Sequence, residues 1–498
     1  MAQKAEEFSN RWGIILAALG MAIGAGNLWR FPRLAGQYGG SFILLWIIFL
    51  FIWSIPLLLA EFSIGKKFKA GVIGSFRQLA GEKYTWMGFF ITVCTLGIAF
   101  YYSIVTAWAL QYLGVSISET FSDTSLSQTL LQNPDYLDQQ WQGIANQNTI
   151  TIILYIAVLI GGVTLLSFGV QKGLERANKV LIPSLFILIV IIVIISLNMP
   201  NGSKGLEYMF AIDVSLFKNP TIWIEALSQS AWSTGAGWGL MMTLSSYTQS
   251  NEDVTLNTFV GAFGNNTASL IAGMAILPSV FALAASDSEA ISYLQSGNQA
   301  LTFIVIPKLF ATVPGGTYLS VLFFLALFFA AFSSLLPMIE LFIGNVTIFG
   351  YSRKQVSIAV LVIFIILGFP SAYSLDFFSN QDWVWGVGLI LSGMFIMFAV
   401  VKYGVDKFKV DFIDKDSDFR VSKLYFKLPV IGNLFLAAYL IYWWLSQGYS
   451  SYPWFDENGQ WNVIDTYSNA SVVTQWLLVL VIGIMLNRFL NNKLASRL

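Results

Sequence analysis

About twelve apolar stretches run along the chain, and each is long enough to cross a lipid bilayer as a helix. A spanning helix needs roughly 20 predominantly apolar residues. Because lipid offers no hydrogen bonds, the backbone must satisfy itself, as a helix does. Only 11% of the residues are charged, against about 25% in soluble proteins. The sequence therefore predicts an all-α polytopic membrane protein. The expected spans are 12–35, 41–64, 86–114, 149–167, 178–198, 221–247, 256–284, 317–348, 356–372, 383–402, 428–447 and 472–490.

The first span contains a break. Residues 20–32 read Gly-Met-Ala-Ile-Gly-Ala-Gly-Asn-Leu-Trp-Arg-Phe-Pro. Gly20, Gly24 and Gly26 weaken the helix at mid-depth, and Asn27 adds a polar amide there. Non-helical backbone is tolerated at that depth only where it lines a cavity. The freed half-helix ends can hold an ion and a charged solute group, which favours a solute carrier.

A second glycine-rich break lies five spans later, in residues 228–239, Ser-Gln-Ser-Ala-Trp-Ser-Thr-Gly-Ala-Gly-Trp-Gly. Matching breaks in two halves are typical of an inverted repeat with its binding site at the membrane midplane. We therefore expect a 5+5 inverted repeat with broken helices 1 and 6. The expected organisation is a tail at 1–11, a first repeat at 12–200, a second repeat at 201–405, and spans 11 and 12 with a C-terminal tail at 406–498.

Composition removes several classes of function. The chain has no histidine, a single cysteine (Cys94) and a formal net charge of zero. Zinc sites and disulfides therefore have no residues to form them, and nothing favours nucleic acid. An intramembrane enzyme needs a nucleophile–base pair or a metal, and no such set occurs at one depth. The chain is not expected to be an enzyme.

The distribution of Lys and Arg predicts orientation. Loops 65–85, 168–177, 349–355 and 402–427 carry basic residues, whereas loops 115–148, 373–382 and 448–471 carry none. Both termini are then cytoplasmic, in a multi-pass plasma (inner) membrane protein. Loop 248–255 is the exception, because it is expected inside yet has no basic residue.

Each polar motif also has a plain structural reading. Gly20 and Gly24 fit a helix-packing motif, and Asn265 with Ser269 can simply join helices. Ser333-Ser334 can bond to their own helix, and Tyr101-Tyr102 can be core aromatics. Arg30 and Asp382 are interface charges separately, but as a pair they make an outer gate.

Taken together, these residues resemble a known family. Gly20–Pro32, Tyr101-Tyr102, Lys172-Gly-Leu-Glu-Arg176, the broken span 6 and Ser333-Ser334 are similar to the neurotransmitter:sodium symporters, from residue 11 to about 490. The resemblance implies sodium-coupled import by alternating access and two sodium sites. Sodium 1 would use Ala22, Asn27, Ser233 and Asn265, and sodium 2 would use Gly20, Ile23, Ala330, Ser333 and Ser334. Hard cations favour such oxygen ligands.

The resemblance also implies an amino-acid site. The substrate carboxylate would meet Ala25, Gly26 and the Tyr102 hydroxyl, and the ammonium would meet the carbonyls of Ala22, Trp232 and Ser233. With glycine at position 24, where amine carriers of the family have aspartate, the substrate must bring its own carboxylate. The full substrate set is Met21, Ala22, Gly24, Ala25, Gly26, Ile98, Tyr102, Trp232, Ser233, Gly235, Trp238, Ser334 and Met338.

The residues at a few individual positions predict a chloride site and the size of the substrate. Ser269 stands where chloride-independent relatives have an acidic residue, so the resemblance implies a chloride site formed by Trp46, Gln229, Ser233, Asn265 and Ser269. Trp238 and Met338 take up room in the pocket, which favours a small neutral amino acid. A carrier of larger aliphatic or aromatic amino acids, using the space above Gly235, and a sodium-dependent receptor of the same fold are the alternatives. Phe8 and Ile348 replace inner-gate residues of the family, so the inner side is expected to close differently.

Overall fold

The computed structural model describes residues 6–497, which fold into helices joined by short loops. Among these residues, ten helices or fused helices are long and apolar enough to cross a membrane. One of them, Arg30–Phe68, joins the outer half of the first span to the whole of the second. The interrupted first and sixth spans are not among these ten as whole spans. Adding them gives the twelve spans that the sequence predicts. Residues 1–5 of the expected tail lie outside the described residues.

The first span is interrupted as predicted. Helix α1 (Arg11–Ala22) ends at Ile23, and Gly24 has extended backbone with φ −109° before α2 (Ala25–Leu28) begins. Helix α3 (Arg30–Phe49) contains a turn at Gly39, where φ is +58°. A β-carbon at Gly39 would lie 2.8 Å from the Ala211 carbonyl oxygen, so the turn requires glycine. The second span then continues through η1 (Leu50–Ser54) and α4 (Ile55–Phe68).

The sixth span is also interrupted. Helix α12 (Pro220–Thr234) and helix α13 (Leu240–Ser245) are separated by five residues, three of them glycines at positive φ: Gly235, Gly237 and Gly239. Only glycine adopts these values at low cost. The Gly237 N–H donates to Glu61 Oε1 of α4 at 2.6 Å. A buried carboxylate thus replaces the hydrogen-bond partners that the helix has lost.

The other spans are continuous or nearly so. They are α6 (Thr85–Thr120), α9 (Thr149–Ser167), η3 with α10 (Val170–Glu175 and Arg176–Leu197), α14 (Val254–Leu283), α18 (Gly316–Thr347), α19 (Arg353–Tyr373), α20 (Leu375–Tyr403), α22 (Lys423–Ser446) and α23 (Asn469–Ala495). Shorter helices lie in the connections: α5 (Gly71–Ala80), η2 (Glu82–Tyr84), α7 (Leu126–Gln132), α8 (Tyr136–Ala145), α11 (Gly202–Phe210), η4 (Val214–Lys218), α15 (Asp287–Leu294), α16 (Asn298–Ala300), η5 (Leu301–Val305), α17 (Ile306–Phe310), α21 (Val405–Phe408), η6 (Lys409–Ile413) and η7 (Asp414–Asp416).

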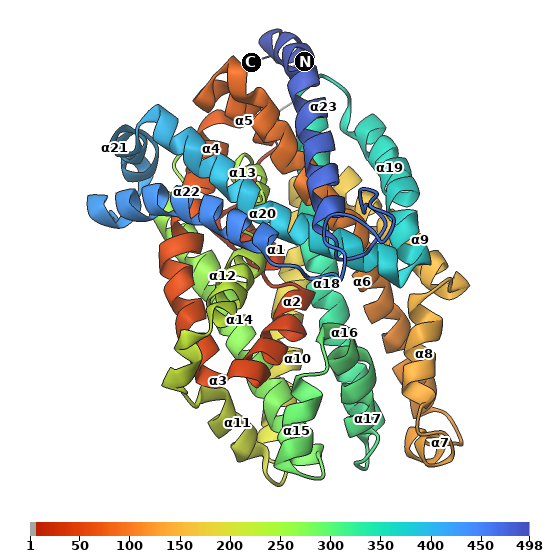
Figure 1. Ribbon diagram of the computed structural model, residues 1–498. Coiled ribbons are helices and arrows are strands. Elements are labelled where there is room, and N and C mark those ends of the chain that lie inside the picture. The colour runs from red at the N-terminus through yellow and green to blue at the C-terminus, as the bar shows by residue number, and fades with distance from the viewer. Residues whose placement is uncertain (1–5, 498) are drawn as a thin grey trace.

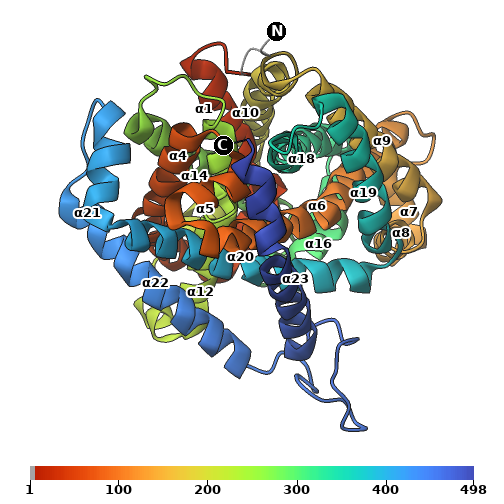
Figure 2. The same ribbon diagram turned by 90° about the horizontal axis from the view of Figure 1, so that it is seen from above.

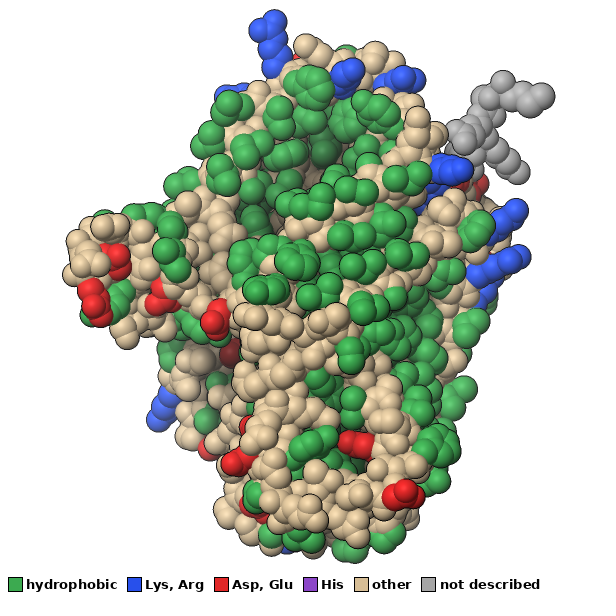
Figure 3. Space-filling view, turned by 90° about the vertical axis from the view of Figure 1, so that its right-hand side faces the viewer, with side chains coloured by type: hydrophobic (Ala, Val, Ile, Leu, Met, Phe, Trp, Pro, Cys, Tyr) green, Lys and Arg blue, Asp and Glu red, His purple; other side chains and the backbone are tan. Residues whose placement is uncertain are grey.

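The spans differ in how much of each is covered by its neighbours. The most apolar stretch of α6 is 78% buried inside the protein, whereas that of α22 is 28% buried. Figures 1 and 2 show α6 and α14 inside the bundle and α9, α19 and α22 on its outside. Exposed Leu, Ile and Phe side chains form a band across the face in Figure 3, with Lys and Arg mainly at one end. This band is the surface that lipid covers.

Candidate substrate and ion site

A cavity of about 440 Å³ lies between the two helix breaks and opens toward the ends of α12, α20 and α22. Its deep part is lined by the broken segments, by Tyr102 of α6, and by Ser334 and Met338 of α18. Every substrate residue predicted from the sequence lines this cavity except Ala25 and Ile98. Ala25, which lies between the lining residues Gly24 and Gly26, and Ile98, one helical turn before Tyr102, are both fully buried.

One end of the deep cavity is polar. The Ala25 N–H, at the start of α2, donates to the Tyr102 hydroxyl at 2.9 Å. Gly24 sits against the same hydroxyl, because a β-carbon there would lie 2.7 Å from Tyr102 Oη and 2.9 Å from Ser334 Oγ. The start of α2 therefore presents an N–H group and a hydroxyl together, which suits a carboxylate.

The other end is apolar. The rings of Trp232 and Trp238 meet edge to face at 4.9 Å, and the Trp238 carbonyl accepts from Thr95 at 2.6 Å. A β-carbon at Gly235 would lie 3.1 Å from the terminal methyl of Met21. The space that Gly235 leaves is thus filled by the end of a flexible side chain.

The residues predicted for sodium 1 come together beneath the polar end. The Oδ1 atom of Asn27 accepts from the Gly24 N–H at 3.0 Å, and its Nδ2 donates to Asn265 Oδ1 at 2.8 Å. The same Asn265 oxygen lies 2.9 Å from the Ser233 carbonyl oxygen and 3.1 Å from that of Ala22. With its oxygen and nitrogen exchanged by rotation, the Asn265 amide points its NH₂ toward both carbonyls and donates to each of them.

The residues predicted for sodium 2 lie where α1 meets α18. Ser334 Oγ donates to the carbonyl of Gly20 at 2.8 Å, and Ser333 Oγ donates to that of Ala330 at 3.0 Å. All five predicted residues, Ile23 included, are buried. Ser334 thus ties α18 directly to the end of α1.

The predicted chloride residues are connected in part. Asn265 Nδ2 donates to Ser233 Oγ at 3.0 Å, and Ser269 Oγ accepts from Asn27 at 2.7 Å. Gln229 is buried, and neither of its amide atoms has a hydrogen-bond partner among residues 6–497. The indole N–H of Trp46 also has no acceptor there. These free donors are of the kind that an anion requires.

A sequence model of the sodium:neurotransmitter symporter family matches residues 5–151 and 134–496 of the chain. The chain belongs to this family. It is 30% identical to an uncharacterized sodium-dependent transporter of Methanocaldococcus jannaschii, over 84% of this chain and 85% of that relative. It is also 25% identical to the sodium-dependent serotonin transporter of Drosophila melanogaster, over 82% of this chain and 72% of that relative.

A solved structure of the same architecture is MhsT in complex with L-phenylalanine, with a TM-score of 0.75 and 29% identity, covering 88% of this chain and 98% of MhsT. This symporter is therefore a sodium-dependent multi-pass membrane transporter rather than an enzyme. The fold class expected from its broken helices is confirmed.

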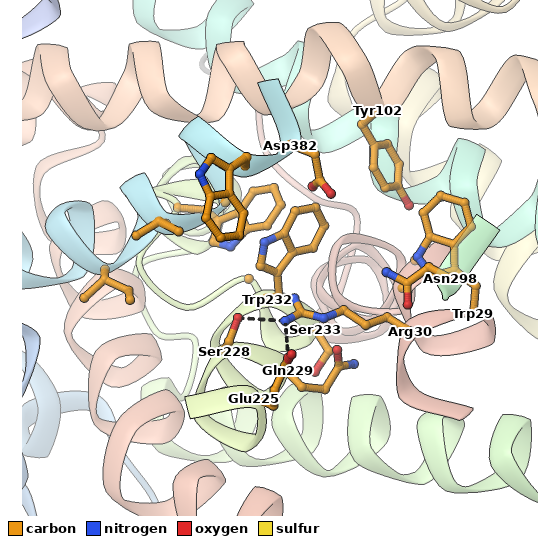
Figure 4. Close-up of a pocket in the computed structure, with 18 of the residues that line it drawn as sticks. Trp29, Arg30, Tyr102, Glu225, Ser228, Gln229, Trp232, Ser233, Asn298 and Asp382 are labelled. Carbon is orange, nitrogen blue, oxygen red and sulfur yellow. Dashed lines mark hydrogen bonds and ion pairs between the residues drawn. The ribbon is translucent and has the colours of Figure 1, made fainter. Parts of the chain in front are cut away.

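The two residues predicted to form a gate in the symporter, Arg30 and Asp382 of α20, both line the cavity. Arg30 donates to Glu225 Oε2 at 3.0 Å and to Ser228 Oγ at 2.9 Å, as Figure 4 shows. In this structure Arg30 is thus paired with Glu225 of α12, and the Arg30–Asp382 gate stays a prediction.

A cluster of charged and aromatic residues joins the segment before α1 to α18 and α19 of the symporter. Arg353, at the start of α19, forms ion pairs with Glu340 of α18 and, at 3.2 Å, with Glu6. Tyr247 donates to Glu340 at 2.6 Å and packs edge to face on Phe8. An acidic residue in an apolar span is the signal that could have pointed to Glu340.

Around this cluster, the segment before α1 is anchored at several points. Glu6 Oε2 accepts from the Val170 N–H at 3.0 Å, and Glu175 accepts from the Ser9 N–H at 2.9 Å. Arg11 forms an ion pair with Glu252 at 2.7 Å. Loop 248–255, which lacks basic residues, is thus held by Arg11 of α1.

Proposed function

We propose that this symporter imports a neutral amino acid together with two sodium ions by alternating access. The observation that carries the proposal is the convergence of Ala22, Ser233 and Asn265 oxygens beneath an N–H-lined cavity. The carbonyl oxygens of Ser233 and Ala22 lie 2.9 and 3.1 Å from one terminal atom of the Asn265 side-chain amide. With the amide oxygen in that position, the three oxygens form a set that a sodium ion can coordinate.

A second ion fits between α1 and α18. The hydroxyls of Ser333 and Ser334 now donate to the carbonyls of Ala330 and Gly20. Rotating each hydroxyl hydrogen away leaves its oxygen beside those carbonyls and that of Ile23, as a set of neutral oxygen ligands. Binding there joins the end of α1 to α18, so ion occupancy is coupled to the position of α1.

The substrate class follows from the polar end of the cavity. Gly24 leaves no carboxylate of the protein beside sodium 1, and the start of α2 offers the Gly26 N–H and the Tyr102 hydroxyl. A substrate that brings its own carboxylate completes both sets of contacts, whereas an amine does not. The ammonium of the same substrate meets carbonyls at the ends of α1 and α12.

Reconstituted vesicles test this proposal. Uptake of labelled amino acid should require an inward sodium gradient, and choline should not replace sodium. Asn27→Ala should weaken sodium and substrate binding together, because the two are reciprocally linked. Equal uptake with and without a sodium gradient would refute sodium coupling. Sodium-dependent binding without accumulation would instead indicate a receptor of the same fold.

Substrate size depends on Met21, Trp238 and Met338. With the Met21 methyl over Gly235, the pocket favours small neutral amino acids such as glycine or alanine. The alternative is a larger apolar amino acid, which the MhsT complex with L-phenylalanine supports; it requires Met21 to swing out of the space above Gly235. Competition by alanine at lower concentration than by phenylalanine or tryptophan supports the small substrate, and the reverse order refutes it.

Chloride is the proposed counter-charge. Sodium ions in a low-dielectric site are costly without a nearby negative charge, and the matched position for an acid is Ser269. Uptake should fall when gluconate replaces chloride, and Ser269→Glu should restore it. Wild-type uptake that is indifferent to chloride would contradict this site.

We further infer that both termini are cytoplasmic in the plasma (inner) membrane, and that the 5+5 repeat divides near residues 200 and 405. The excess of Lys and Arg in loops 65–85 and 402–427 supports this orientation. Labelling of single cysteines introduced into loops 115–148 and 65–85, in a Cys94→Ser background, tests it. Reaction of the second loop from outside intact cells would reverse the orientation.

A further inference from the structure

Helices α1 and α10 meet along a polar seam, which we define as Gly13, Gly20, Glu175 and Asn178. The two glycines are seven residues apart on α1 and so share one face, while Glu175 and Asn178 are three residues apart at the start of the fifth span. A β-carbon at Gly13 would lie 2.7 Å from Glu175 Cδ, and one at Gly20 would lie 2.5 Å from Asn178 Oδ1. The glycines therefore allow two polar side chains to lie flat against α1.

The two polar side chains of the seam differ in their partners. Glu175 accepts from the Ser9 N–H at 2.9 Å and from Lys179 Nζ at 2.6 Å. Asn178 is fully buried, and neither its Oδ1 nor its Nδ2 has a hydrogen-bond partner among residues 6–497. A buried amide without partners is costly, and a leucine of similar size would avoid that cost.

The position of Asn178 links it to the second sodium site. Its amide covers Gly20, whose carbonyl accepts from Ser334 and belongs to the proposed sodium 2 set. From there the seam runs along α1 toward Ser9 and the end of the molecule where both chain ends lie (Figure 1). Asn178 is therefore the polar residue of the seam that lies beside the proposed sodium 2 site. Glu175 is the next polar residue along the seam toward Ser9.

We propose that Asn178 is a transient sodium ligand on the inner release path. When the inner half of α1 separates from α10, the Asn178 amide oxygen takes over the ion from the Gly20 carbonyl, and the Glu175 carboxylate draws it toward the cytoplasm. In the closed state the amide has no partner, because its partner is the leaving ion. This inference rests on the proposed sodium coupling.

The side of the membrane on which sodium acts distinguishes an ion-binding role of Asn178 from a purely structural role. Uptake into proteoliposomes is measured while sodium is varied outside and, separately, inside, where rebinding of sodium inhibits uptake. Asn178→Leu should raise the internal sodium concentration for half-inhibition by about tenfold or more, because a polar contact to a charged group is lost. Asn178→Asp should lower it. External sodium dependence should stay the same in both variants.

Two further measurements make the test decisive. The melting temperature of Asn178→Leu should equal or exceed that of the wild type, since an unpartnered amide is removed. The control is Ser196→Ala on the same helix, whose hydroxyl bonds to the Val193 carbonyl at 3.1 Å; neither sodium dependence should change.

A lower melting temperature with parallel shifts on both sides would show that Asn178 is structural and would overturn the inference. An unchanged internal sodium dependence in Asn178→Leu would overturn it as well. If wild-type uptake ignores sodium on both sides, the proposed function itself fails. That result is distinct from a failure of Asn178 alone.

Discussion

Single residues decide what the site can bind, and Gly24 shows this most directly. Its lack of a side chain lets the Tyr102 and Ser334 hydroxyls approach the start of α2, within 2.7 and 2.9 Å of where a β-carbon would be. An aspartate cannot occupy that position unless both hydroxyls move. The same glycine therefore breaks the helix and admits the tyrosine hydroxyl, and under the proposed function it leaves the carboxylate to the substrate.

We predict that Gly24→Ala lowers substrate affinity by about tenfold or more, because one displaced charge-assisted hydrogen bond costs about 1.5–3 kcal/mol. The added methyl pushes Tyr102 away from the Ala25 N–H. The measurement is equilibrium binding of labelled amino acid at saturating sodium. Gly114→Ala, on the same helix as Tyr102 and with open space around its β-carbon, should bind normally. Unchanged affinity in Gly24→Ala would place the carboxylate elsewhere.

At the scale of the elements, each gate is a contact between spans that must break and re-form. On the outer side, Arg30 of α3 binds α12 through Glu225 and Ser228 while the cavity is open. In the proposed gate, closure exchanges these partners for Asp382 of α20. The two carboxylates therefore compete for one guanidinium.

This competition predicts opposite effects for the two acids. Glu225→Gln should raise apparent substrate affinity, by up to about fivefold, because an ion pair whose side chains remain 19% and 28% exposed and which favours the open state contributes about 1 kcal/mol. Asp382→Asn should reduce transport more than equilibrium binding, because closure is impaired. Paired binding and uptake assays measure both. Normal turnover in Asp382→Asn would show that it is only an interface charge.

In the proposed inner gate, Glu6 of the segment before α1 forms an ion pair with Arg353 of α19. Glu6→Gln removes the ion pair to Arg353 and should increase the inward-open population severalfold, since such pairs contribute up to about 1 kcal/mol. A cysteine at buried Ala17 of α1, in a Cys94→Ser background, should react faster with a reagent added from the inside. Glu82→Gln, which breaks the exposed pair with Arg77, should not change the rate. An equal rate in Glu6→Gln would remove Glu6 from the gate.

Across the whole molecule, ions and substrate stabilise one arrangement of the two breaks. Because each ligand completes contacts that the other needs, their effects on stability should exceed the sum of the separate effects. Sodium and amino acid together, with the amino acid at 100 times its Kd, should add about 2.7 kcal/mol to the unfolding free energy. Thermal unfolding in detergent measures this. Additive shifts, or a full shift without sodium, would contradict coupling.

The sequence by itself determined the spans and the breaks, because both depend on local chemistry. The span expected at 149–167 is α9 (Thr149–Ser167), since apolar length is set by the bilayer. Boundaries were less exact where polar residues continue a helix, as in α20, which begins at Leu375 rather than 383. Gly24 and Gly235 marked the breaks, because glycine weakens any helix regardless of its neighbours. Asn27 and Ser334, which the resemblance assigned to ion sites, line the cavity, and their role as ion ligands stays a prediction.

Only the tertiary structure decided which charges meet. Arg30 binds Glu225, 195 positions along the chain, rather than Asp382, and Glu6 reaches Arg353 across 347 positions. Asn178 gave no signal in its sequence context, and its importance lies in facing Gly20 with no partner. A hydrogen bond or ion pair between distant spans depends on helix rotation and depth to within a few ångströms, and no local pattern of residues records either quantity.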